Sequence, residues 1–370
     1  MNGVWPLNSR TVTATAILTA TDSQIYLDAS AGPFTITLPS PVAGRAIVLE
    51  RTDASANVVT IAGTATALTL SATHGKTLTS DGTAWYLAGR AEPNGTYVQM
   101  VTGLDATGAT NASVIIQAAL DAAFAAGGGE VILPRGIFRI NTSLIIRSGV
   151  TLRGTGRGKT ILRPPTGTIG SVTVNGAFIG CCVAMVGAVK AAVLGLTVDL
   201  TTNSAGANGI AMMPEGAAYN GTRTTDSTVQ DCEVLGNGNA QYCIWNLRGQ
   251  RNKILFNYVN GGSVASNTQE GIEVFGGDDI LVMGNTVRNV GSHGIYSNSA
   301  GGVAATDRLA VRVIDNTVDT ADVGLEFDAD AADGSLKNST VRGNTVTNMR
   351  TAGVSIACTA TGVIRNLEVA

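Results

Sequence analysis

The chain has 370 residues, a net charge of −3 and 46 glycines, with only 14% charged and 5% aromatic residues. This length allows two or three domains. The weak negative charge and the lack of a Lys/Arg cluster argue against a nucleic-acid partner. The longest apolar run, residues 183–198, contains Lys190 and is too short to cross a membrane, so no membrane insertion is expected.

The cysteines and the N-terminus indicate where the protein is made. There are five cysteines, an odd number, and none forms a CxxC pair. Neither a disulfide framework nor a zinc site is expected, and the sequence predicts no metal and no cofactor. Residues 1–10 form an N-terminal tip without the basic and apolar parts of a signal peptide. We therefore expect synthesis in a reducing cytoplasm.

Residues 11–92 have the texture of a small β-domain. Short alternating runs such as FTITLP (34–39) and WYL (85–87) are separated by turn signals such as AGP (31–33). Many short strands with such punctuation predict a compact antiparallel β-domain. The segments DASAG (28–32), TITLP (35–39), KTLTSDGT (76–83) and WYL resemble a small β-domain common in bacteriophage tail and fibre proteins. The resemblance implies a virion module that attaches the protein to a phage tail or baseplate.

A linker at 93–104, containing PNG (93–95), leads to a predicted helix at about 112–126. Asn111 is placed to cap its start, and Gly127 follows its end. The expected apolar stripe contains Val114, Ile115, Ala118, Ala119, Ala122 and Phe124. We expect this helix to plug the first turn of a coil, because an open end would expose apolar core and unpaired backbone.

The second half of the chain repeats one short pattern. A Val or Ile stands three residues before each anchor, and a Val stands two residues after it. The anchors are Leu196, Cys232, Asn257, Asn285, Asn316, Asn344 and Leu367. Their spacings of 36, 25, 28, 31, 28 and 23 residues indicate a stacked repeat, and the Gly, Asn, Thr and Val between them favour strands and turns over helices. The pattern predicts a parallel β-helix in which each strand pairs with the turns above and below.

The opening of this coil resembles a known superfamily. The segments DATG (105–108), IQAALD (116–121), GGG (127–129), GIF (136–138) and GVTLRG (149–154) resemble the pectate-lyase-like right-handed parallel β-helices found in phage tailspikes. The resemblance implies a right-handed single-stranded parallel β-helix over residues 105–370, with a capping helix. It also implies a homotrimer that binds and cleaves bacterial surface polysaccharide. The coil is expected to end at Ala370 in mid-rung, through truncation or because another protein covers that edge.

Four anchors are asparagines: Asn257, Asn285, Asn316 and Asn344. Aligned on successive rungs, they can form a ligand-binding ladder or a structural ladder that satisfies turn backbone. Because apolar residues flank the column on both sides, we expect the structural ladder.

A second strand in each rung carries the candidate chemistry. Alternation places Ile272, Ile295, Leu325 and Val354 inward, so the residues that follow them face out. The outer residues are Glu273, Tyr296, Glu326 and Ser355, and two positions further on Phe275, Asn298 and Asp328. We predict Glu273, Glu326 and Asp328 as catalytic carboxylates, and Tyr296, Phe275 and Asn298 as substrate-binding residues. An ordinary solvated acidic face is the alternative.

Other motifs in this region carry less information. Glu270 and His293 form a second adjacent pair whose direction the alternation leaves open. A nucleophile–base pair at Ser292–His293 is not expected, because adjacent strand residues point to opposite faces and no orienting acid is apparent. Asp328, Asp330 and Asp333–Gly334 match a calcium loop only loosely, because the spacing is one residue too long.

The leading hypothesis is a phage or prophage tailspike of the glycoside hydrolase type, located in the virion tail. A structural tail fibre or adhesin without turnover is one alternative. A polysaccharide lyase is another, since Arg288, Arg312 and Arg342 lie on rungs, but a lyase commonly needs calcium as well as a base.

Overall fold

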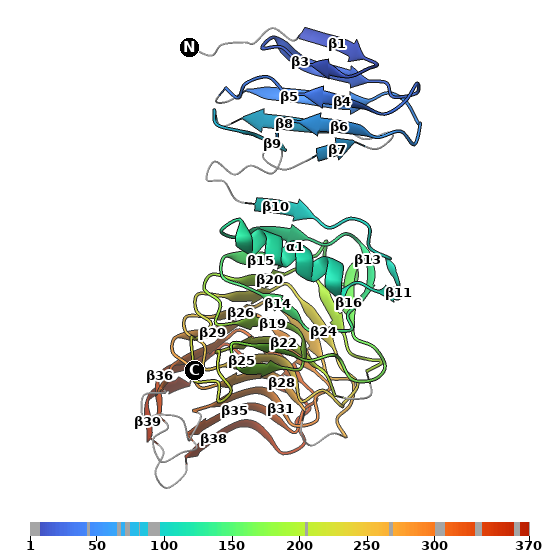
Figure 1. Ribbon diagram of the computed structural model, residues 1–370. Coiled ribbons are helices and arrows are strands. Elements are labelled where there is room, and N and C mark those ends of the chain that lie inside the picture. The colour runs from blue at the N-terminus through green and yellow to red at the C-terminus, as the bar shows by residue number, and fades with distance from the viewer. Residues whose placement is uncertain are drawn as a thin grey trace. The chain divides into compact units, whose positions relative to one another are not determined.

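A computed structural model of the chain describes residues 8–42, 45–64, 68–70, 75–80, 82–87, 97–203, 206–265, 269–299, 308–329, 335–358 and 363–369. The chain divides into two compact units, Met1–Tyr97 and Val98–Ala370. Nearly all regular structure is β (Figure 1). Across the described ranges, no helix is long and apolar enough to span a membrane.

The first unit packs two sheets around one apolar core. The five-stranded sheet contains, in spatial order, β1 (Asn8–Val12), β3 (Asp22–Leu27), β5 (Ala46–Arg51), β8 (Gly75–Ser80) and β9 (Trp85–Leu87). The four-stranded sheet contains β2 (Ala16–Ile17), β4 (Phe34–Thr37), β6 (Val59–Ala62) and β7 (Leu68–Leu70). Alternate residues of both sheets, such as Ile25, Ile36 and Leu49, are fully buried between them.

The prediction that this unit is antiparallel is wrong for most of its strands. The pairs β1–β3, β3–β5, β2–β4 and β4–β6 are parallel, and only β5–β8, β8–β9 and β6–β7 are antiparallel. The chain crosses from one sheet to the other after each of its first strands, so consecutive strands are not hairpin partners. Polar–apolar alternation and turn residues are the same in both arrangements and do not distinguish them.

The second unit is a coil of three sheets. Sheet 1 contains β10 (Tyr97–Met100), β12 (Gly129–Ile132), β15 (Val150–Arg153), β20 (Ala192–Leu194), β23 (Thr228–Gln230), β26 (Lys253–Leu255), β29 (Ile280–Met283), β33 (Val311–Ile314), β36 (Ser335–Arg342) and β32 (Arg308–Leu309), with β39 (Val363–Val369) beside β36. Sheet 2 contains β11 (Thr107–Asn111), β13 (Gly136–Arg139), β16 (Thr160–Arg163), β21 (Thr197–Asp199), β24 (Glu233–Leu235), β27 (Tyr258–Asn260), β30 (Thr286–Arg288), β34 (Thr317–Asp319) and β37 (Thr345–Thr347).

Sheet 3 carries the functional candidates. It contains β14 (Leu144–Ile146), β19 (Cys181–Val186), β22 (Asn208–Met213), β25 (Tyr242–Leu247), β28 (Glu270–Phe275), β31 (His293–Asn298), β35 (Val323–Ala329) and β38 (Ala352–Cys358). All of its pairs are parallel, as in a β-helix. A separate antiparallel hairpin, β17 (Val172–Val174) with β18 (Ala177–Ile179), is inserted between β16 and β19.

The repeat register is confirmed for six of the seven predicted rungs. Val229, Ile254 and Val282 pair in turn across sheet 1, and Val234, Val259 and Val287 pair across sheet 2. All six side chains are fully buried. The seventh rung is wrong, because β39 pairs with β36 from Ser335 to Val341 and places Leu367 opposite Ser339, not Asn344.

The asparagine column is a structural ladder, as predicted. The side-chain oxygen of Asn285 accepts hydrogen bonds from the backbone and side-chain nitrogens of Asn257, at 2.9 and 3.0 Å. Its Nδ2 donates to the oxygens of Ile254, Met283 and Asn316. Each buried amide thereby satisfies backbone groups where the chain turns from sheet 1 to sheet 2, which leaves little capacity for a ligand.

The predicted helix is α1 (Ser113–Ala125), and it packs against β12, β14 and β15 at the first turns of the coil (Figure 1). Asn111 Oδ1 accepts the backbone N–H of Ser113, and Gly127 continues past the helix end at φ +89°. The expected stripe is partly wrong: Val114 is 72% exposed, and the buried face consists of Ser113, Ile116, Ala119, Leu120 and Ala123.

Candidate active site

One column of side chains lies along the outer face of sheet 3, and it changes from apolar to aromatic and acidic residues along its length. We call it the outer column. In spatial order it contains Ile145, Ala184, Ala211, Trp245, Glu273, Tyr296, Glu326 and Ser355. The first three are small or apolar, and the next four are aromatic or acidic. The predicted register of Glu273, Tyr296 and Glu326 is therefore confirmed.

The β17–β18 hairpin explains the apolar end of the outer column. Val174, Ala177 and Ile179 of the hairpin pack with Ile145 and Ala184 in one buried cluster. Trp245 and Phe275 lie at the border of this cluster and are partly buried. The hairpin thus covers the upper rungs with apolar side chains, and the acidic and aromatic rungs begin where this cluster ends.

Glycines that face the core bring a second set of residues to the same outer face. A Cβ atom on Gly271 would collide with the core side chain of Val287, and one on Gly294 would collide with Val318. Gly271 and Ile272 therefore both face the core. Two consecutive inward residues break the alternation, so Glu270, which precedes the glycine, lies on the outer face with Glu273. The same geometry places His293 beside Tyr296.

His293 bridges two carboxylates. Its Nδ1 lies 2.8 Å from Glu270 Oε2, and its Nε2 lies 2.7 Å from Glu326 Oε2. Burial lowers the pKa of His293, but the hydrogen bonds and charges of Glu270 and Glu326 outweigh burial, so the pKa is raised. The imidazole ring stacks on Tyr296 with its centroid 4.6 Å away. The bridge fixes the position of Glu326 and favours a protonated imidazole.

Glu273 is the most unusual acid of the site. The residue is 3% exposed, and its Oε2 has no hydrogen-bond partner within the described part of the chain. Burial, together with the negative charge of Glu270, raises the pKa of Glu273 to about 8. This carboxyl group is therefore protonated at neutral pH and available as a proton donor.

Aromatic and amide groups surround the acids. Trp245 stacks on Tyr242 with centroids 4.6 Å apart, one rung above Glu273. Asn298 Nδ2 donates to the Tyr296 hydroxyl at 2.8 Å, and that hydroxyl donates to Asp328 at 3.4 Å. Burial, with Asp328 adding to it, raises the pKa of Tyr296, so the phenol stays protonated.

All six predicted site residues lie on this face. Phe275, Asn298 and Asp328 form a second column beside the outer column. Sequence reasoning left open the direction of Glu270 and His293, which the structure places at the centre of the site. The Gly that follows each of them, at Gly271 and Gly294, is the signal that could have found them.

Ser292 and His293 were not expected to form a nucleophile–base pair, and the two reasons given for that expectation are wrong. Ser292 Oγ lies 2.9 Å from His293 Nδ1, and Glu270 provides an acid at the same nitrogen. Since carboxylates contact both ring nitrogens, His293 has no free nitrogen to accept the serine proton. The arrangement therefore does not activate Ser292 as a nucleophile.

The residues considered for a lyase or a calcium site lie away from this face of sheet 3 or are already paired. Arg288 pairs with Asp319 on sheet 2, and Arg312 of β33 in sheet 1 pairs with Asp279. Over the described ranges, no group of three or more His, Cys, Asp or Glu is arranged to hold a metal ion. Asp330, Asp333 and Gly334 of the loose calcium motif lie outside the described residues.

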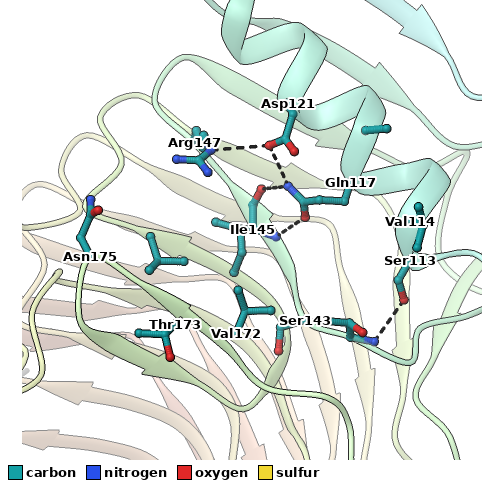
Figure 2. A pocket seen from close by; sticks show the side chains of 13 residues that line it. Ser113, Val114, Gln117, Asp121, Ser143, Ile145, Arg147, Val172, Thr173 and Asn175 are labelled. Atoms are coloured by element: carbon teal, nitrogen blue, oxygen red, sulfur yellow. Dashed lines mark hydrogen bonds and ion pairs between the residues drawn. The ribbon is translucent and has the colours of Figure 1, made fainter.

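A cavity of about 600 Å³ lies between α1 and the β17–β18 hairpin (Figure 2). Its charged groups, Asp121 and Arg147, face each other at 3.5 Å. Gln117 is held by the backbone N–H and carbonyl of Ile145. With its polar groups paired to one another, this cavity offers no catalytic set, and the candidate site is the acidic part of sheet 3.

Comparisons with known proteins support this fold. Residues 209–369 match the family model of a right handed beta helix region. Two structures of a tailspike protein of E. coli bacteriophage HK620 align with TM-scores of 0.50 at 15% and 14% identity, covering 72% and 75% of this chain and 53% and 56% of theirs. The predicted right-handed parallel β-helix is confirmed, and so is the resemblance to phage tailspikes at the level of the fold.

One local sequence match links the chain to a named enzyme. The mannuronan C5-epimerase AlgE4 of Azotobacter vinelandii is 42% identical over 65 residues, which are 16% of this chain and 12% of the epimerase. The chain thus matches only a small part of that relative and about half of each tailspike.

Proposed function

We propose that the outer face of sheet 3 binds and hydrolyses a bacterial surface polysaccharide, and that the chain acts as a phage tailspike. The observation that carries the proposal is the buried Glu273 on the same column as Glu326, with Tyr296 between them. The raised pKa of Glu273 supports it. The tailspike likeness of the fold and the local match to an enzyme named for a polysaccharide support this assignment.

The spacing of the two acids is suitable for glycoside hydrolysis that inverts the configuration at the anomeric carbon. Glu273 and Glu326 are two rungs apart in register, which puts their Cβ atoms about 9.6 Å from each other. Inverting glycosidases hold their two carboxyl groups ~6.5–9.5 Å apart, leaving room for a water molecule. The two Glu side chains are long enough to reach carboxyl separations within this range.

We assign the roles of the two acids from their environments. Glu273, protonated at neutral pH, gives its proton to the glycosidic oxygen as the bond to the anomeric carbon breaks. Glu326 takes a proton from water, whose oxygen bonds to the anomeric carbon from the opposite side of the ring. The water supplies one new hydroxyl group, and Glu326 returns its proton to solvent while Glu273 regains one.

The neighbouring residues position these groups. His293, held by Glu270, keeps Glu326 in place and is a positioning residue. Tyr296 stacks on a sugar ring, and Asn298 and Phe275 contact the substrate beside it. Asp328, next to the Tyr296 hydroxyl, tunes the site or substitutes for one acid.

The experiment is incubation with panels of purified capsule and lipopolysaccharide, followed by analysis of products. Hydrolysis yields oligosaccharides with ordinary reducing ends. Products with an unsaturated uronate would identify a lyase. Binding without products would identify a structural fibre or adhesin. Arg312→Ala, on another sheet, serves as the control variant, and its activity should equal that of the wild type.

We further propose that the protein is a homotrimer and that its first unit attaches it to a phage tail or baseplate in the virion. The tailspike likeness of the coil and the sequence resemblance of residues 28–87 to phage tail domains support this role. Light scattering at micromolar concentration tests the assembly: a mass three times that of the chain is expected, and a clean monomer would contradict it.

A further inference from the structure

The acids of the site lack basic partners other than one histidine. Glu270, Glu273 and Glu326 have no Lys or Arg partner among the residues that the structure describes, and their charged contact is His293. The pKa of Glu273 is raised by burial and by Glu270, with no cation opposing the rise. When His293 is protonated, its single positive charge faces the two carboxylates of Glu270 and Glu326, so a ligand on this face still meets excess negative charge.

Two buried polar atoms point to what the ligand must offer. Glu273 and Asn298 are 3% and 7% exposed, and both belong to the outward-facing columns. Within the described ranges, Glu273 Oε2 and Asn298 Oδ1 have no hydrogen-bond partner. Because a buried polar atom without a partner is costly, these positions select a ligand that brings hydroxyl or amide groups to them.

Stacked aromatic pairs stand on both sides of Glu273. Tyr242–Trp245 lies above it and His293–Tyr296 lies below it. Flat rings of this kind present apolar faces with polar edges, which matches the C–H faces and hydroxyl edges of sugar rings.

From this arrangement we infer that the site takes polysaccharides whose sugar rings at sheet 3 are uncharged, and that it rejects uronate-rich and otherwise anionic glycans. The inference rests on the proposed function. A sugar carboxylate about 6 Å from the one negative charge that His293 leaves unneutralised on Glu270 and Glu326 would be repelled strongly enough to weaken binding about 100-fold, at an effective dielectric constant of about 20.

The test uses one polymer in two charge states. A neutral surface polysaccharide that the full chain binds is compared with the same polymer after its primary hydroxyls are oxidised to carboxylates. We expect the oxidised form to bind about 100-fold more weakly, with partial recovery at high salt because the repulsion is screened. A uronate-rich polymer, alginate, is measured alongside and is expected not to bind.

Variants show whether binding occurs at this face. Trp245→Ala and Tyr296→Ala should each weaken binding of the neutral polymer, with melting curves to verify folding, whereas Arg312→Ala on sheet 1 should not. If the oxidised polymer or alginate binds as well as the neutral one and Trp245→Ala abolishes that binding, the inference is overturned and the proposed function stands. If no polymer of either class binds, the proposed function fails and the inference fails with it.

Discussion

Replacing Glu273 by Gln should stabilise the fold while it removes a catalytic group. The carboxyl group has an ordinary pKa of 4.5 in the unfolded chain, and burial beside Glu270 raises the pKa to about 8 in the folded protein. Between these values the folded state holds a proton that the unfolded state releases. Stability is therefore lost as the pH rises from about 4.5 to about 8, because the native state binds more protons than the unfolded state.

The size of the effect follows from the same two pKa values. Each pH unit across this window lowers the free energy of unfolding of the wild type by about 1.4 kcal/mol. The total loss is therefore about 3 kcal/mol at pH 7. Gln has the shape of the protonated acid and no charge to desolvate. We expect Glu273→Gln to match the wild type near pH 4.5 and to exceed its free energy of unfolding by about 3 kcal/mol at pH 7.

The assay is guanidinium unfolding of both proteins at pH 5, 6, 7 and 8. Glu368→Gln, at an exposed position of the coil, measures any general effect of removing one carboxylate. A stability difference between Glu273→Gln and the wild type that is the same at pH 5 and pH 8 would refute the argument from burial. A variant less stable than the wild type at pH 7 would refute it as well.

Three further substitutions test the fold and the bridge that His293 forms between Glu270 and Glu326. Asn285→Ala leaves the buried N–H of Asn257 without its acceptor and should cost about 3 kcal/mol of stability, measured by chemical unfolding; no loss would mean that the ladder is not structural. Val287→Asp buries an unpaired charge at a fully buried position and should lower the melting temperature sharply, and a parent-like melt would show that the rung register is wrong. His293→Gln removes a group whose raised pKa stabilises the fold below about pH 6.5 and loses that effect as the pH rises further. Its destabilisation should be larger at pH 5.5 than at pH 8.5 in thermal melts, and the reverse order would contradict the charged bridge.

The repeated features of the coil could be predicted from sequence because the same apolar positions recur in each rung. Invariant apolar positions fix the register, and strand alternation then places Glu273, Tyr296 and Glu326 in one column. The rule fails where two adjacent residues face the core, which is why the roles of Glu270 and His293 were not evident. Their contact depends on a glycine that faces the core beside another inward residue, and not on periodicity.

Features that depend on pairing partners were harder to predict. The parallel pairing of the first unit is encoded in crossovers between two sheets, which leave the same alternation as hairpins. The hairpin at 172–179 covers the upper rungs of sheet 3, and that cover decides where the accessible site begins. The burial of Glu273, and with it the raised pKa, follows from this three-dimensional packing and from no local sequence signal.

The most direct test of the central claim is the rate of reducing-end release by Glu273→Gln and Glu326→Gln, measured with the glycan on which the wild type is active. Each variant should lose turnover by about 10³-fold or more, as expected for a general acid or base, while its affinity for the glycan stays within a few-fold of the wild type. Full activity in both variants would contradict the account and remove this face of sheet 3 as the catalytic site.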